Sequence, residues 1–372
     1  MSNWKPLGEF IDECCIKCGG GDVEVSGVDI NKQFISTRAN LDGTDISKYY
    51  VVPKRCFACN LMHIGRDERL PIAYNATDDN IVVTSAYYVF KIKNDKRTEL
   101  LDEFLYIILS SKELDRLTWF YTDSSIRGNL KASRFKDIRI PVPRIEVQRS
   151  VVAAWQGLRE MQAQNERLAA TLMPLCRSYL QDLKHKYKAV EIGDLIKQRD
   201  ERNRDNKYGE ESARGVNTQK EIQPCKRLGE KLDTYKIAYQ NDFVFNANIK
   251  LTKETEKFAI DLYTDEAPII VTNFYTVFYI DDQKRLLPEF LLLILSRDEF
   301  ARYVKFMSCS SIRDRFDFHE MQMVKIPLPP IEVQQAIVSI FQSAQTAKQL
   351  AGKANYMSRN ICPALIQKAI HS

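Results

Sequence analysis

The sequence repeats itself at a fixed offset of 186 residues, which is half of its length of 372. Residues 140–148 read IPVPRIEVQ and residues 326–334 read IPLPPIEVQ, so 7 of 9 positions are identical. Two further pairs align at the same offset without a gap: 124–127 with 310–313, and 103–110 with 289–296. Agreement of this length indicates a tandem duplication, and we predict two copies of one structural unit.

Each copy has the sequence pattern of an α+β domain. Short runs of β-branched and aromatic residues, separated by Asn, Asp and Pro, predict a compact curved sheet. Apolar residues spaced three and four apart predict an amphipathic helix after the last of these runs. The predicted strands are 49–52, 81–84 and 87–90 in the first copy and 235–237, 243–245, 269–272 and 275–278 in the second, and the predicted helices are 99–117 and 287–306.

A long helix is predicted after each proline motif, because apolar residues recur with alternating spacings of four and three for more than four heptads. The apolar stripe of the first helix has large side chains at the positions where the stripe of the second helix has small ones. We therefore predict that the two helices pair antiparallel as a coiled coil. Leu158 is expected to meet Ser358, Met161 to meet Ala354, and Leu168 to meet Ala347; Leu172 and Ala344 belong to the same two stripes.

The predicted fold is therefore α+β, with two pseudo-symmetric domains joined by the two long helices. Its boundaries are 1–144 for the first domain, 145–186 for the first helix, 187–329 for the second domain and 330–372 for the second helix. Pro174 and Pro363 are expected to kink or break the helices. The 28 residues from 146 to 173 would span about 42 Å at 1.5 Å per residue.

The composition argues against several classes of protein. No apolar run approaches the roughly 18 residues that cross a bilayer, and the start is not a signal peptide, so a cytoplasmic location is expected. The four histidines are scattered without metal-ligand spacing, and the sequence has no Walker loop and no dinucleotide-binding glycine motif. We expect no catalytic residue and no cofactor in this chain. The net charge of +5 permits a nucleic-acid partner without requiring one.

Four of the nine cysteines have a spacing that a zinc site could use, namely Cys15, Cys18, Cys56 and Cys59. The second copy has Asp242 and Phe245 in place of the last two, so its fold does without the metal. Packing of these cysteines as small apolar residues is the preferred interpretation, and a zinc site is the alternative.

A basic segment precedes the first proline motif. It contains six cationic residues and one acidic residue, whereas its counterpart in the second copy has more acids. Cations beside a rigid element suit contact with phosphates, and a solvated surface is the alternative. The six are Arg127, Lys131, Arg134, Lys136, Arg139 and Arg144.

The sequence SSIRGNLK at 124–131, followed by the proline motif and a long helix and repeated once, resembles the specificity subunit of type I restriction–modification enzymes. The resemblance covers essentially the whole chain, which is somewhat short for that family. It implies a non-catalytic subunit that reads a two-part DNA sequence with its two target-recognition domains, while the helices act as spacer and docking surface. The length of the predicted helix is close to the 34–36 Å that separates half-sites one helical turn apart.

The same resemblance implies the partners. These are two modification subunits, which bring S-adenosylmethionine and methylate adenine, and restriction subunits that use ATP and magnesium. The alternatives are an orphan or inactive copy, a coiled-coil scaffold without a DNA role, and, least favoured, a self-contained nuclease or methyltransferase.

The resemblance and the basic segments together nominate residues for DNA contact. The candidates for the DNA backbone are Arg127, Lys131, Arg134, Arg313 and Arg315. Asn and Arg side chains can form paired hydrogen bonds with adenine and guanine, and a purely structural role is the alternative for each candidate. The candidates for the bases are Asn60, Arg66, Asn246 and Lys250.

Overall fold

The computed structural model describes residues 4–371, apart from 22, 38–39, 42, 63, 65–67, 124–127, 218, 226, 230, 248–257 and 309–314. At 361–363 and 367–371 only the backbone is described. The chain divides into two compact units, and each contains half of each long helix. Unit 1 comprises Met1–Asn165 and Gln349–Ser372, and unit 2 comprises Glu166–Lys348.

Unit 1 contains two four-stranded sheets. The first is antiparallel, in the order β2-β9-β6-β7, and the second, in the order β4-β3-β8-β5, has one parallel pair, β3 with β8. A separate two-stranded ribbon pairs β1 with β10. The strands are β1 (Trp4–Pro6), β2 (Ile11–Glu13), β3 (Val25–Val28), β4 (Phe34–Ser36), β5 (Tyr50–Val52), β6 (Cys56–Cys59), β7 (Ile72–Tyr74), β8 (Ile81–Val83), β9 (Tyr88–Ile92) and β10 (Arg139–Pro141).

Unit 2 repeats this topology. Its antiparallel sheet has the order β12-β19-β16-β17, and β11 pairs with β20. Two two-stranded sheets, the hairpin β13–β14 and the pair β15–β18, replace the second sheet, and a parallel bridge between Ala213 and Ile270 stands where β3 meets β8 in unit 1. The strands are β11 (Ala189–Glu191), β12 (Ile196–Arg199), β13 (Arg214–Val216), β14 (Ile222–Pro224), β15 (Lys236–Ala238), β16 (Phe243–Asn246), β17 (Ile260–Leu262), β18 (Ile269–Val271), β19 (Tyr275–Ile280) and β20 (Lys325–Pro327).

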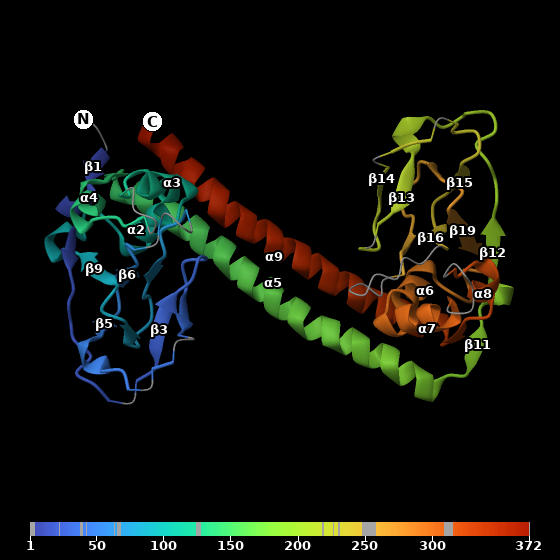
Figure 1. Cartoon of the computed structure of the whole chain (residues 1–372), viewed down its shortest axis with the longest axis horizontal. Helices are drawn as coiled ribbons and strands as arrows, with labels where there is room; N and C mark the ends of the chain where they lie inside the picture. Colours follow the sequence, from blue (N-terminus) through green and yellow to red (C-terminus); the bar gives the residue numbers. More distant parts are fainter. Residues whose placement is uncertain are drawn as a thin grey trace. The chain divides into compact units, whose positions relative to one another are not determined.

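The helices follow the same repeat (Figure 1). Each predicted helix after the strands is in fact two helices, because the Ser111 hydroxyl accepts a hydrogen bond from the Leu114 N–H and starts a new helix in unit 1. The duplication and the α+β class are confirmed. The helices are α2 (Asp102–Leu109), α3 (Lys112–Phe120), α4 (Ala132–Asp137), α5 (Ile145–Lys186), α6 (Pro288–Leu295), α7 (Asp298–Ser308), α8 (Phe318–Gln322) and α9 (Ile331–His371).

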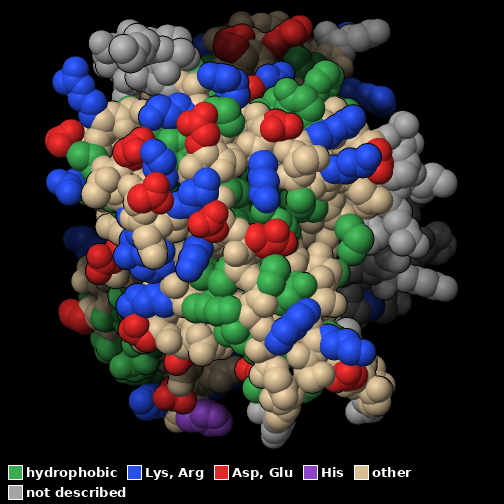
Figure 2. All heavy atoms as spheres, turned by 90° about the vertical axis from the view of Figure 1, so that its left-hand side faces the viewer, with side chains coloured by type: hydrophobic (Ala, Val, Ile, Leu, Met, Phe, Trp, Pro, Cys, Tyr) green, Lys and Arg blue, Asp and Glu red, His purple; other side chains and the backbone are tan. Residues whose placement is uncertain are grey.

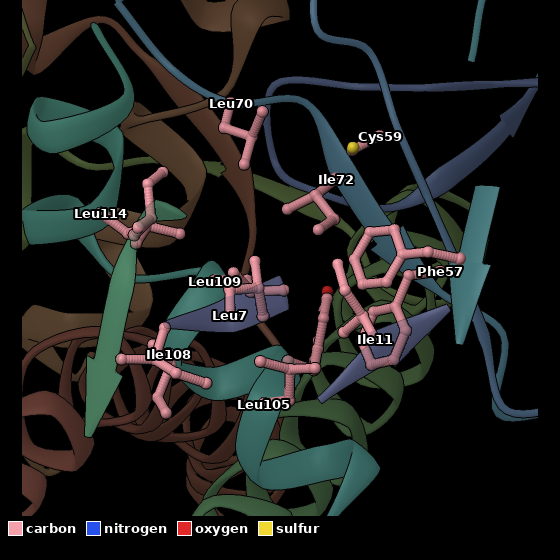
Figure 3. Packing of buried hydrophobic residues seen from close by; sticks show 14 of the residues in the cluster. Leu7, Ile11, Phe57, Cys59, Leu70, Ile72, Leu105, Ile108, Leu109 and Leu114 are labelled. Carbon is pink, nitrogen blue, oxygen red and sulfur yellow. The ribbon is translucent and has the colours of Figure 1, made fainter. Parts of the chain in front are cut away.

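Aromatic side chains form the centre of each core. In unit 1, Phe57 of β6 stacks on Phe90 of β9 with ring centroids 5.0 Å apart. Figure 3 shows Leu109 of α2 gathered with Ile72 and Phe57 of the sheet in this core. In unit 2 the equivalent strands place Phe243 on Phe278, with centroids 4.7 Å apart. The core of unit 1 also includes Val151 and Val152 from the start of α5, so the long helix is part of the domain.

The repeated proline motif ends in a glutamine that is completely buried in both units. The Gln148 amide nitrogen donates to the carbonyls of Glu99 (2.7 Å) and Pro143 (2.8 Å), and its oxygen accepts from the Leu101 N–H (3.0 Å). The set recurs in unit 2, where the amide of Gln334 bonds to the Arg285 and Pro329 carbonyls and the Leu287 N–H, each at 2.9 Å. Each glutamine therefore joins a long helix to the start of α2 or α6.

The long helices α5 and α9 run antiparallel within each unit, and the buried stripe of α9 lies where the sequence predicts it. Its residues Ala344, Ala347, Ala351, Ala354 and Ser358 are all buried.

The stripe of α5 is displaced from the prediction. Met161 and Leu168 are 46% and 47% exposed, while Ala169 and Cys176 are buried. Leu158 and Leu172 are partly buried, and Leu158 packs on the unit 1 core. Met161 and Leu168 therefore lie outside the buried stripe of α5, and their pairing with the alanines of α9 stays a prediction. Small residues such as Ala169 allow two helices to approach closely.

Neither long helix is broken at its proline. The helix α5 continues through Pro174, and α9 continues through position 363. Pro174 is exposed, so the carbonyl that loses its hydrogen-bond donor lies on the solvent side of the helix. The expected break is therefore absent from both helices.

Replacing either buried glutamine tests its structural role. Gln148→Ala and Gln334→Ala each leave three backbone groups without their partner, and we expect a loss of about 3 kcal/mol in the free energy of unfolding. Urea denaturation measures the loss. The exposed neighbour provides a matched control, since Gln335→Ala should change stability by less than about 0.5 kcal/mol. Equal effects for Gln334 and Gln335 would contradict this role.

The observed face of α5 is tested by a pair of adjacent substitutions. Leu168→Ala should reduce the free energy of unfolding by less than about 1 kcal/mol, because the side chain is half exposed. Ala169→Leu should destabilise by about 1–3 kcal/mol, because it overpacks the contact with α9. Thermal or urea unfolding measures both, and the opposite ranking would support the face predicted from the sequence.

Candidate nucleic-acid interface

The part of the basic segment from Lys131 to Arg139 lies on α4 and β10, and two of the predicted phosphate contacts there are accessible. Lys131, at the N-terminus of α4, is exposed. Arg134 is also exposed, and its guanidinium donates to the Tyr121 carbonyl at the end of α3 (3.0 Å). Arg139 donates to the Trp4 carbonyl (2.6 Å). Lys131 and Arg134, two of the predicted contacts with the DNA backbone, therefore lie on one exposed stretch beside the end of α3.

The end of α3 presents aromatic side chains that the sequence analysis missed. Phe120 is 77% exposed, with Trp119 and Tyr121 exposed on either side of it. Phe306, near the end of α7 in unit 2, is 79% exposed. The two phenylalanines occupy equivalent positions, 186 residues apart. An exposed aromatic ring beside cations suits contact with nucleic-acid bases, and the shared offset was the signal that could have found this pair.

The basic surface is not duplicated in unit 2. Arg315 is exposed, as a phosphate contact requires. However, two acidic residues, Asp317 and Glu320, form a capping box at the first turn of α8. Lys325 forms an ion pair with Glu191 at 3.2 Å. The equivalent surface segments of the two units therefore carry different charges.

Two predicted base contacts also have structural roles. The Asn60 side-chain oxygen accepts from the Met62 N–H (2.9 Å) and closes the turn after β6. Asn246 ends the equivalent strand, β16, and its backbone N–H donates to the Ala259 carbonyl (3.0 Å). Both side chains are half-buried. Arg66, Arg127, Lys250 and Arg313 lie outside the described residues.

A repeated hairpin turn places one lysine of each unit in a left-handed backbone conformation. Lys32 and Lys220 both have φ of 65°. Lys32 is buried, and its ammonium donates to Asp115 (2.6 Å) and to the Leu109 carbonyl (2.9 Å). Burial lowers the pKa of Lys32, and the ion pair with Asp115 opposes that effect. The Lys220 ammonium donates to the Ser296 carbonyl (2.5 Å), so in both units the turn is held against a helix end.

The cysteines do not converge on one point. Cys56 and Cys59 are both buried on β6, but an odd separation along a strand places them on opposite faces of the sheet. They accordingly belong to different apolar clusters. Burial raises the pKa of both thiols, that of Cys56 to about 12. The four-cysteine zinc site is therefore incompatible with this strand, and apolar packing accounts for both residues.

The outer face of unit 1 shown in Figure 2 carries Lys and Arg interspersed with Asp and Glu. That face has no large area of a single charge. Among the helices in the described part of the chain, none is long and apolar enough to span a membrane.

The chain resembles known proteins in sequence and in fold. A family model, described as the type I restriction modification DNA specificity domain, matches residues 21–167 and again 184–352. The S subunit of a type I restriction–modification system from M. genitalium has a TM-score of 0.62 at 12% identity, over 99% of this chain and 96% of that one. The HsdS subunit from Thermoanaerobacter tengcongensis has a TM-score of 0.41 at 16% identity, over 99% and 96%. No curated protein sequence matches significantly.

The buried ion pair of the unit 1 turn provides a test of its contribution to stability. Lys32→Met leaves Asp115 buried without its cation, and we expect a loss of about 3–5 kcal/mol in the free energy of unfolding. The double variant Lys32→Met/Asp115→Leu should recover part of that loss, because it removes the unpaired charge. Urea denaturation compares the two variants. A double variant that is less stable than the single one would show that Asp115 contributes mainly through its bond to the Leu70 N–H (2.9 Å).

Proposed function

Because this chain belongs to the type I restriction–modification DNA specificity family, we propose that it reads a two-part DNA sequence, one part with each unit. The observation that carries the proposal is that the family model matches each repeat separately. The two repeats share one sheet topology and differ in the charge of their exposed segments. A common scaffold with different surfaces is what recognition of two different half-sites requires.

The proposed roles of the residues follow from their exposure. Lys131 and Arg134 in unit 1 and Arg315 in unit 2 are exposed cations, suited to phosphate contacts that position the protein without reading sequence. Asn60 and Asn246 end equivalent strands, and base contacts by their side chains would read sequence. Phe120 and Phe306 would add apolar contact with bases or sugars beside these groups.

The proposed partners are two modification subunits and the restriction subunits of the same system. The duplication supports two modification subunits, because two copies of one fold can each bind a copy of the same partner. Methylation of adenine would use S-adenosylmethionine bound by the modification subunits, and cleavage would use ATP and magnesium bound by the restriction subunits. This chain would contribute recognition and assembly, and we assign it no catalytic residue.

A DNA-binding assay of the chain assembled with its modification subunits tests the proposal. Lys131→Ala and Arg134→Ala should weaken binding to all sequences alike and reduce the dependence of log K on log salt by about 0.9 for each phosphate that the protein no longer neutralises. Lys54, which pairs with Asp78 at 2.7 Å, provides a control, and Lys54→Ala should leave the salt dependence unchanged.

Sequencing of methylated adenines then distinguishes recognition from scaffolding. Asn60→Ala should relax the sequence read in one half of the site only, and Asn246→Ala the sequence in the other half. An assembly that methylates nothing, or that binds DNA without any sequence preference, would contradict the proposed function. A complex that forms normally but never binds DNA would support a scaffold role instead.

A further inference from the structure

Unit 1 has a small basic cavity where the turn between β3 and β4 meets the helices. Its volume is about 130 Å³. It is bounded by that turn, by the end of α2 and the start of α3, and by one segment each of α5 and α9, all within unit 1. Its charged lining residues are Lys32, Arg69, Lys112, Asp115, Arg159 and Arg359.

The charges of this cavity do not balance. Asp115 is its single carboxylate and is already paired with Lys32 at 2.6 Å. Within the described part of the chain, the other four cations form no ion pair. The cavity therefore gathers four cations in addition to the Lys32–Asp115 pair, from a loop and three helices.

The hydrogen bonds of two of these cations are long and involve neutral groups. The Arg159 guanidinium donates to the side-chain oxygen of Gln162 at 3.3 Å and lies 6.0 Å from the centre of the Trp155 ring. Arg359 donates to the side-chain oxygen of Asn31 at 3.4 Å. The Ser110 hydroxyl, which also lines the cavity, is buried beside the Tyr106 hydroxyl. These groups retain hydrogen-bonding capacity for a further ligand.

We propose that this cavity binds a phosphate group. Guanidinium groups form short, charge-assisted and often paired hydrogen bonds with phosphate oxygens, and hydroxyl donors complete the coordination. The volume of about 130 Å³ is sufficient for one tetrahedral oxyanion. The bound phosphate would link the turn to α3, α5 and α9 and would stabilise unit 1.

The equivalent cavity of unit 2 lacks this character. It is larger, about 430 Å³, and Phe341, Leu292 and Ser296 line it at the positions of Trp155, Tyr106 and Ser110. Two carboxylates, Asp298 and Glu299, enter its lining, and Asp298 occupies the position of Lys112. The residue equivalent to Arg159 is Gln345, which is neutral. Arg177, Arg297 and Arg302 also line the cavity of unit 2, but Arg297 is paired with Glu299 (2.8 Å). The proposed phosphate site is therefore assigned to unit 1, and unit 2 serves as an internal control.

Two sources can supply the phosphate group: a free phosphate ion, or a phosphodiester of bound DNA. The proposed site rests on contacts within unit 1 and does not require the proposed recognition of DNA. Failure of one proposal is therefore distinguishable from failure of the other, because binding of free phosphate is measured without DNA.

Titration of the full chain with inorganic phosphate, at constant ionic strength set with chloride, tests the site. Because Trp155 lines the cavity, we expect saturable binding of one phosphate with a change in tryptophan fluorescence and a rise in Tm. Arg159→Gln and Arg359→Gln should each weaken binding about tenfold, since each removes a charge-assisted hydrogen bond. Arg177→Gln, in the cavity of unit 2, should leave the affinity unchanged.

A second variant checks the origin of the signal, and DNA binding identifies the source of the phosphate. Trp155→Phe should abolish the fluorescence change while the rise in Tm remains. If phosphate competes with duplex DNA and Arg159→Gln/Arg359→Gln weakens both ligands, the group is a DNA phosphodiester. If DNA binding is unaffected, the ligand is the free ion. Absence of saturable phosphate binding, or an equal loss in Arg177→Gln, would overturn the proposal.

Discussion

Two buried amides connect the long helices to the domains. Gln148 and Gln334 each saturate three backbone groups where the chain leaves the last strand and where the first helix of the domain begins. Because an unpaired buried backbone group is unfavourable, these bonds fix the direction in which each long helix leaves its domain. The position of each long helix relative to its own domain depends on these bonds. The near-identity of the two proline motifs has its physical explanation here.

The two units share their core contacts and differ in their surface residues. Stacked phenylalanines on equivalent strands, Phe57 with Phe90 and Phe243 with Phe278, form the same core contact twice. At the surface, the basic stretch of α4 corresponds to the acidic capping box of α8, and a basic cavity corresponds to a larger cavity of mixed charge. Packing constrains buried residues in both copies, whereas surface residues are free to diverge and to serve different ligands.

The exposed phenylalanines differ from both the shared core residues and the divergent surface residues. Both units have the same residue at this position although it is not buried. Phe120 and Phe306 occupy equivalent positions near the ends of α3 and α7, where most of each ring meets solvent. The contacts predicted from the sequence are cations and amides, because these groups have an evident chemistry toward nucleic acid. An exposed aromatic residue cannot be distinguished from a core residue until the fold shows which side of the helix it occupies.

The sequence alone determined the duplication, the α+β class, seven of the strands and the start of both long helices, because each depends on local pattern or on direct identity between the repeats. Only the tertiary structure decided which face of α5 is buried. Heptad spacing placed Leu168 in the pairing stripe, whereas the structure buries its neighbour Ala169 and leaves Leu168 half exposed. The cavity around Lys32 and Arg159 likewise depended on tertiary structure, since its cations come from segments far apart in the sequence and meet only after folding.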